Sequence, residues 1–169
     1  MLAVGRERHS RIPKTPPLSA AGKWQVAWDR QGVRPGSARG TAIFDAHTWP
    51  WSSSPALGNT MLRKLHEGDL IVVRGKGRLL CYKVSRRVSI HVSQPDPKGF
   101  YSTKGPSQIV ITVCSGRRLG PGNWSRRTYW FARPWIPRPA TPPPAPAPAP
   151  EPPSSPGLLG GLLGGLFGG

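Results

Sequence analysis

Two cysteines and four histidines are the side chains of this sequence best suited to nucleophilic and acid–base chemistry. Cys114 ends a strand-like run over residues 108–114 and is followed by Ser-Gly and two arginines. A thiol that can be exposed in an electropositive place ionises readily. Cys81 lies inside an apolar run, where cysteine usually packs as a small apolar side chain. Cys114 is therefore the candidate nucleophile. The alternative for either cysteine is a buried, inert apolar side chain.

His47 is the histidine whose position best suits proton transfer. It closes a strand-like run over residues 41–46 and opens a loop rich in tryptophan, and working side chains are often carried by such loops. His9 lies in a basic arm, His66 ends a short helical run, and His91 lies on the polar face of an alternating strand. Histidine titrates near neutral pH, so His47 is the candidate acid–base partner of Cys114.

Short strands with apolar alternation dominate the elements that would position these groups. The runs fall at residues 24–28, 41–46, 69–74, 78–84, 86–92, 108–114 and 127–132. One short helix is expected after residue 60, capped by Asn59 or Thr60, and Gly68 ends this segment. The pattern predicts an all-β barrel or sandwich.

Composition divides the chain into four segments. Residues 1–22 are basic and contain several prolines, which predicts a disordered arm, and residues 23–134 form the folded domain. Residues 135–156 read as an extended Pro/Ala-rich linker. Residues 157–169 repeat Gly and Leu and are too short to span a bilayer. They predict either a flexible, sticky tail or an element that contacts a membrane surface or a second copy.

The formal net charge of +17 favours anionic partners. A basic β-barrel that binds nucleic acid or an anionic envelope polymer is therefore an alternative, with stacking aromatics at Trp49, Trp51, Phe100 and Tyr101. The positive residues are spread along the chain, which makes nucleic acid the weaker expectation. Two cysteines form no disulfide framework, and no Cys/His spacing is typical of zinc. No apolar run long enough for a signal peptide or membrane helix occurs near Met1, which leaves two interpretations: the protein is not exported by that route, or the given start lies downstream of the true one.

Several segments, taken in order, resemble the sortase family and most closely its actinobacterial class F. TAIFDAH resembles the family's apolar strand ending in Gly-His, with Ala46 in place of glycine. IVITVC resembles its Thr-Leu-x-Thr-Cys, with Val113 in place of threonine. NWSRRTYWFA resembles its aromatic-then-arginine strand, and WQVAWDRQGVRPG and GNTMLRKLHEGDLIVV resemble two further segments. The resemblance covers residues 17–132 and implies a closed sortase-type β-barrel of about eight short strands with one or two short helices.

The resemblance also implies an activity, that of a cysteine transpeptidase. Cys114 would attack the Thr–Gly carbonyl of a Leu-Pro-x-Thr-Gly sorting signal, His47 would move protons, and Arg127 would bind the developing oxyanion. Arg126 is the alternative, because adjacent strand residues face opposite ways. The expected substrate-binding residues are Ala46, Phe100, Tyr101, Thr112 and Trp124.

The implied partners are sorting-signal peptides of secreted proteins and an amine acceptor, either a peptidoglycan precursor or a pilin lysine. The implied location is the extracytoplasmic face of the membrane or the cell envelope. No cofactor is expected, and no metal either, because Asp96 is the single acidic residue of the loop over residues 94–105. A hydrolase that releases its acyl group to water and a sortase fold without activity remain alternatives.

Overall fold

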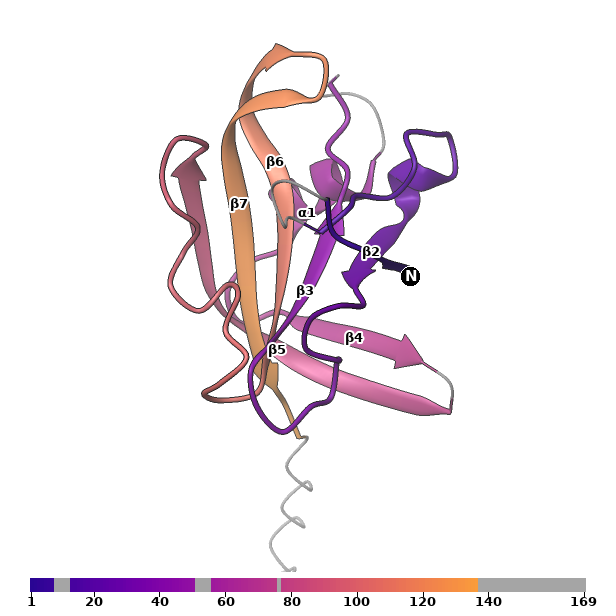
Figure 1. The fold of residues 1–169 in the computed structure, drawn as a ribbon, viewed down its shortest axis with the longest axis vertical. Helices are drawn as coiled ribbons and strands as arrows, with labels where there is room; N and C mark the ends of the chain where they lie inside the picture. The colour runs from indigo at the N-terminus through magenta and orange to yellow at the C-terminus, as the bar shows by residue number, and fades with distance from the viewer. Residues whose placement is uncertain (8–12, 51–55, 76, 137–169) are drawn as a thin grey trace, which may run out of the picture. The chain divides into compact units, whose positions relative to one another are not determined.

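A computed structural model describes residues 1–7, 13–50, 56–75 and 77–136 of the protein. Seven strands form one sheet in the order β1-β2-β3-β6-β7-β5-β4, and the sheet curls into a half-barrel (Figure 1). The strands are β1 (Leu2–Val4), β2 (Val26–Asp29), β3 (Thr41–Ala46), β4 (Leu70–Gly75), β5 (Arg78–His91), β6 (Gln108–Gly120) and β7 (Asn123–Pro134). The helical elements are the 3-10 turn η1 (Gly22–Trp24) and α1 (Leu57–Lys64). The all-β prediction is confirmed, with fewer and longer strands than expected.

The central strands are longer because two segments predicted as breaks continue in the sheet. Residues 78–84 and 86–92 were expected as two strands, but β5 is one strand with a bulge between Val84 and Arg86, which lets it bend. Residues 115–126 were expected as a loop, but β6 and β7 extend through most of this segment and turn at Pro121 and Gly122. Gly122 has φ 67°, a conformation that suits glycine in a tight turn. Figure 1 shows this hairpin at the top of the view.

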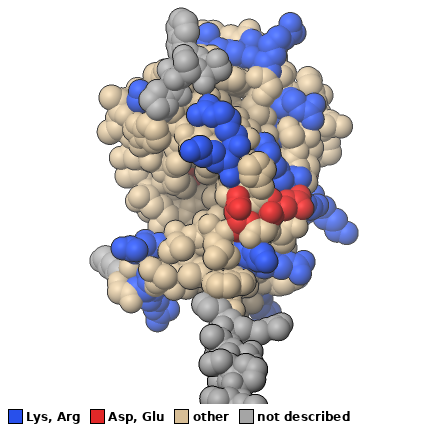
Figure 2. Space-filling model, turned by 180° about the vertical axis from the view of Figure 1, so that it is seen from behind, with Lys and Arg blue, Asp and Glu red and all other residues tan. Residues whose placement is uncertain are grey.

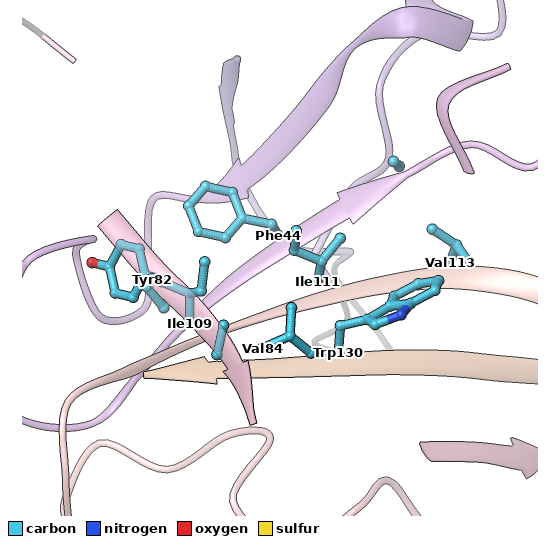
Figure 3. Close-up of a cluster of buried hydrophobic side chains, with 10 residues drawn as sticks. Phe44, Tyr82, Val84, Ile109, Ile111, Val113 and Trp130 are labelled. Carbon is cyan, nitrogen blue, oxygen red and sulfur yellow. The ribbon is translucent and has the colours of Figure 1, made fainter. Parts of the chain in front are cut away.

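Apolar side chains cover both faces of the sheet. The larger cluster gathers alternate residues of β3, β5, β6 and β7, and Figure 3 shows it. Its largest members are Phe44, Tyr82, Ile109, Ile111, Val113 and Trp130. Residues one position along β3, β6 and β7 form a second cluster on the opposite face, made of Ile43, Val110, Tyr129 and Phe131, and Phe100 joins it from the loop between β5 and β6. The period-2 alternation in the sequence therefore has a physical basis in burial on both faces.

Helix α1 packs on the larger cluster and begins earlier than predicted. It starts at Leu57 after Ala56, and Asn59 is buried within it. The Asn59 side chain bonds the backbone of Trp49 instead of capping the helix, since its Oδ1 accepts from Trp49 N–H and its Nδ2 donates to Trp49 O. The Gly58 N–H donates to the His47 carbonyl oxygen at 2.9 Å. The helix start thus holds the segment that follows β3.

The N-terminal residues that the sequence predicts as disordered contain β1, which pairs in parallel with β2. Asp29 at the end of β2 is fully buried, and the Arg6 guanidinium donates to its carboxylate from Nε at 2.8 Å and from Nη2 at 2.5 Å. This ion pair joins two segments far apart in sequence, so local composition gives no sign of it. The structure describes no helix that is long and apolar enough to cross a membrane. The proposed linker beyond Ile136 and the Gly/Leu tail lie outside the described residues.

Candidate active site

Cys114 and Arg127 are direct cross-strand partners in the antiparallel pair of β6 and β7. Cys114 lies within β6 and not at its end, since the strand runs six residues further to Gly120. A bulge follows it between Ser115 and Arg118. Opposite residues of an antiparallel pair project to the same face, so the thiol and the guanidinium meet on the face that carries the second apolar cluster.

His47 reaches the same site from β3. The β3–β6 pair is parallel and ends with Ala46 opposite Val113, so His47 and Cys114 are the next residues of the two segments, just beyond the paired part. The Thr48 hydroxyl donates to the Cys114 carbonyl oxygen at 2.5 Å and ties the two segments together. His47 Nε2 lies 2.5 Å from the Pro16 carbonyl oxygen. Because a carbonyl only accepts, Nε2 carries the proton in this contact.

Two cavities adjoin the thiol. The first has a volume of about 380 Å³, and the second about 200 Å³. His47, Trp49, Arg118 and Trp124 help to line the first, and Phe100, Tyr101, Arg127 and Tyr129 help to line the second. Both are lined by Thr15, Asp45, Cys114 and Gly122. Cys114 therefore lies where the two cavities meet, with room for a chain on either side.

Opposing charges act on the thiol. Burial raises the pKa of Cys114 above its ordinary value, the Asp45 carboxylate raises it further, and Arg127 lowers it. Asp45 itself is desolvated, and this burial raises its pKa to about 8 against the opposing effect of Arg127. The site as it stands therefore favours a protonated thiol.

Arg127 also lies beside Asp96 and Tyr129, which line the second cavity with it. The Tyr129 hydroxyl donates to Asp96 at 2.5 Å, and Arg127 Nη1 lies 3.9 Å from the same carboxylate. Burial opposes the charge of Arg127, yet Tyr129, Asp96 and Cys114 together raise its pKa. Arg126 points elsewhere and donates to the Ser89 hydroxyl and carbonyl oxygens. Of the two arginines that the sequence left open, Arg127 lies at the cavity.

The expected substrate-binding residues divide between the two cavities. Trp124 lines the first, whereas Thr112, Phe100 and Tyr101 line the second. Phe100 is buried and packs edge-on against Tyr129, so it forms part of the cavity wall. Ala46 borders the first cavity, but it is 2% exposed and belongs to the apolar cluster on the opposite face.

The sequence reasoning missed several residues at this site. Asp45 lies two positions before His47 and on the same face, which the strand alternation would have indicated. Thr15 and Pro16 belong to the arm that was read as disordered, so no local signal could have placed them at the thiol. Within the described ranges, no group of three or more His, Cys, Asp or Glu side chains could hold a metal ion.

No family model and no curated protein sequence matches this chain significantly. Among solved structures it is similar to sortase A from Corynebacterium diphtheriae, with TM-score 0.54, 19% identity, and coverage of 69% of this chain and 51% of that one. It is also similar to sortase C1 from Streptococcus agalactiae (TM-score 0.53, 18% identity, 69% and 57% covered). A third is sortase C-1 from Actinomyces oris (TM-score 0.52, 18% identity, 67% and 59% covered). The matches span little more than half of each sortase, and at these identities they show that the chain has the sortase fold.

Proposed function

Taking the sortase fold as the premise, we propose that this protein is a cysteine transpeptidase with Cys114 as nucleophile, His47 as acid–base group and Arg127 as oxyanion-binding residue. One observation supports this proposal above the others. The thiol and the guanidinium are paired directly across β6 and β7, beside a cavity that His47 also lines. A thiol, an imidazole and a fixed cation are the groups that acyl transfer from an amide requires.

The first half of the reaction forms a thioester. The Cys114 thiolate attacks the carbonyl carbon of a Thr–Gly bond, and Arg127 donates hydrogen bonds to the oxyanion that develops. His47 protonates the departing glycine amine as the C–N bond breaks. His47 Nε2 is bonded to the Pro16 carbonyl here, so the segment around Pro16 must release it first.

The second half transfers the acyl group to an amine. An uncharged amine attacks the thioester carbon, His47 accepts its proton, and the thiolate of Cys114 leaves. The proposed donors are sorting-signal peptides of the Leu-Pro-x-Thr-Gly type in secreted proteins. The proposed acceptors are a peptidoglycan precursor amine or a pilin lysine, which places the reaction at the extracytoplasmic face of the membrane or in the envelope. The class F subtype stays a prediction.

The test is turnover of a fluorogenic Leu-Pro-x-Thr-Gly peptide with and without an amine acceptor. Cys114→Ala should abolish turnover while Cys81→Ala retains it. Arg127→Lys should lower kcat/KM by about 100-fold or more, the range found for loss of an oxyanion donor, and Arg126→Lys should have little effect. If the wild-type protein and Cys114→Ala give equal rates across a panel of motif variants, the proposal is wrong. Product that forms equally without amine indicates the hydrolase.

The alternative of a basic binding module has less support. Phe100 is buried in the second cluster, and Trp49 and Tyr101 line different cavities, so these aromatics form no shared stacking surface. Trp51 lies outside the described residues. On the face seen in Figure 2, Lys and Arg lie in several separate groups. Salt-sensitive nucleic-acid binding that persists in Cys114→Ala would favour the module.

A further inference from the structure

Asp45 places a carboxylate beside the candidate nucleophile. It is the Cα partner of Thr112 in the parallel β3–β6 pair, and Thr112 lies two residues before Cys114 on the same face. Arg127 is the partner of Cys114 on the opposite side, in β7. The thiol is therefore flanked by a carboxylate on one neighbouring strand and a guanidinium on the other.

The Asp45 carboxylate borders space that a ligand could occupy. Asp45 and Cys114 both line the two cavities, so the carboxylate lies at the junction where any chain bound across the thiol must pass. Asp29 is bound by Arg6, and Asp96 accepts from Tyr129. Asp45 pairs with its neighbouring strands through its backbone alone. Within the described part of the chain, no hydrogen bond or salt bridge reaches its carboxylate, so these oxygens can accept from a bound molecule.

Charged and titratable groups surround Asp45, and through them its carboxylate affects the ionisation of Cys114 as well as ligand binding. The charged and titratable side chains that line these cavities or act on this pair are Cys114 and Arg118 from β6, Arg127 and Tyr129 from β7, His47 after β3, and Asp96 and Tyr101 from the loop between β5 and β6. The charge of Asp45 disfavours the thiolate of Cys114, because two anions in one desolvated place oppose each other. Their protonation is consequently coupled.

A positive group brought into the cavity changes this balance. Burial keeps Asp45 protonated up to about pH 8, and a bound cation would release this proton at lower pH by hydrogen-bonding the ionised carboxylate. The cation would also cancel the carboxylate charge, so the Cys114 thiolate would experience Arg127 without an opposing anion. Amines and guanidinium groups have both the charge and the donors that an unpaired carboxylate accepts. A neutral or acidic group in the same place would leave the thiol protonated.

We propose that Asp45 is a specificity-determining residue of this site, which selects a substrate that brings a cationic amine or guanidinium group to the cavity junction and couples its binding to ionisation of Cys114. The inference rests on the transpeptidase proposed above. The cationic group has two sources with the same chemistry: a basic side chain of the peptide, or the acceptor amine bound in its protonated form before the peptide acylates Cys114.

Thiol reactivity tests the charge effect without turnover. In a Cys81→Ser background, Cys114 is modified by two methanethiosulfonates of similar size, one with a quaternary ammonium and one with a sulfonate. At pH 9, where Asp45 is ionised, we compare the rate with the ammonium reagent divided by the rate with the sulfonate reagent, normalised to the same quotient for free cysteine. This normalised quotient should fall about tenfold in Asp45→Asn relative to the parent, as expected for loss of one nearby charge. Asp69→Asn is the matched control, because it makes the same change in net charge at a partly exposed position outside both cavities.

The pH dependence gives a second readout that a packing role would not change. The rate of alkylation by neutral iodoacetamide should show a midpoint about one pH unit lower in Asp45→Asn than in the parent, with Asp69→Asn unchanged. Asp45→Ala repeats the test should Asp45→Asn fold poorly. Equal reagent ratios and equal midpoints in the Asp45 and Asp69 variants would overturn the proposal, whether or not the protein turns over peptide.

Two arms identify the source of the cation. Peptides that carry lysine or norleucine next to the scissile bond should differ in kcat/KM for the parent but not for Asp45→Asn if the peptide supplies the charge. If the acceptor supplies it, the two peptides should be equal and the KM for the amine should rise in Asp45→Asn. If the protein turns over peptide but kcat/KM depends neither on the lysine nor, through Asp45, on the amine, the role of Asp45 is contradicted and the transpeptidase proposal stands. The transpeptidase proposal is tested separately, by whether Cys114→Ala abolishes turnover.

Discussion

Replacing Asp45 with asparagine should make the fold more stable at alkaline pH than at acidic pH, relative to the wild type. Burial raises the pKa of Asp45 to about 8, whereas an aspartate in an unfolded chain titrates near 3.9. Between these values the folded state binds a proton that the unfolded state has released. Stability from this group is therefore complete below about pH 4 and is lost as the pH rises toward 8.

The magnitude follows from the difference in pKa. About four units correspond to roughly 5 kcal/mol between the two protonation states. The carboxylate borders a solvent-accessible cavity, so screening should reduce the net effect to about 2–3 kcal/mol. Asparagine has nearly the shape of the protonated aspartate and carries no charge at any of these pH values. It should match the wild type at pH 4.5 and exceed its free energy of unfolding by this amount at pH 8.5.

Urea unfolding followed by tryptophan fluorescence at pH 4.5, 6.5 and 8.5 measures the difference, with Asp69→Asn as the control of equal charge. If the free energies of unfolding of Asp45→Asn and the wild type differ by the same amount at all three pH values, the pKa of Asp45 is not raised in the folded state. A larger advantage at pH 4.5 than at 8.5 would mean that Asp45 is ionised and stabilised in the folded state. Arg127 would then outweigh burial at this carboxylate.

Two further substitutions test how the site is held in place. Gly58→Ala should lower kcat/KM about tenfold or more, because an added Cβ would clash with the His47 carbonyl oxygen and displace His47. Gly75→Ala is the control, since nothing lies within 4 Å of its Cβ. Equal kinetics in the two variants would contradict a role of Gly58 in positioning His47. Tyr129→Phe should lower the free energy of unfolding by about 1–2 kcal/mol through loss of its bond to Asp96, whereas Tyr101→Phe removes a hydroxyl with no such bond within the described residues. Equal urea midpoints for the two phenylalanine variants would show that this bond adds no stability.

The parts of the fold that the sequence predicted are those set by local alternation. Runs such as residues 41–46 and 108–114 alternate because their two sets of side chains enter separate apolar clusters. The same alternation separates Arg127 from Arg126, and the structure brings the former to the cavity and the latter to Ser89. The local pattern was sufficient here because alternate residues of a strand face opposite sides of the sheet, so position along the strand decides which cluster a side chain enters.

The missed features depend on contacts between distant segments. The turn-like composition of residues 115–126 predicted a loop, yet pairing between β6 and β7 continues through most of it and places Cys114 within a strand. The N-terminal arm has the composition of a disordered segment, but the buried ion pair of Arg6 with Asp29 and the contact of Pro16 with His47 fix it to the domain. Turn residues and prolines report local backbone preference, and they contain no information on such distant partners.

The two departures from the sortase pattern at this site are explained by one contact. Ala46 and Val113 are Cα partners in the parallel β3–β6 ladder. Both are at most 2% exposed, and both belong to the cluster packed around Trp130, on the face away from the thiol. A change at either position acts first on how β3 packs beside β6, and each residue borders one cavity only from its wall. The activity of this chain should therefore depend on the residues of the opposite face, Asp45 and Thr112, more than on Ala46 and Val113.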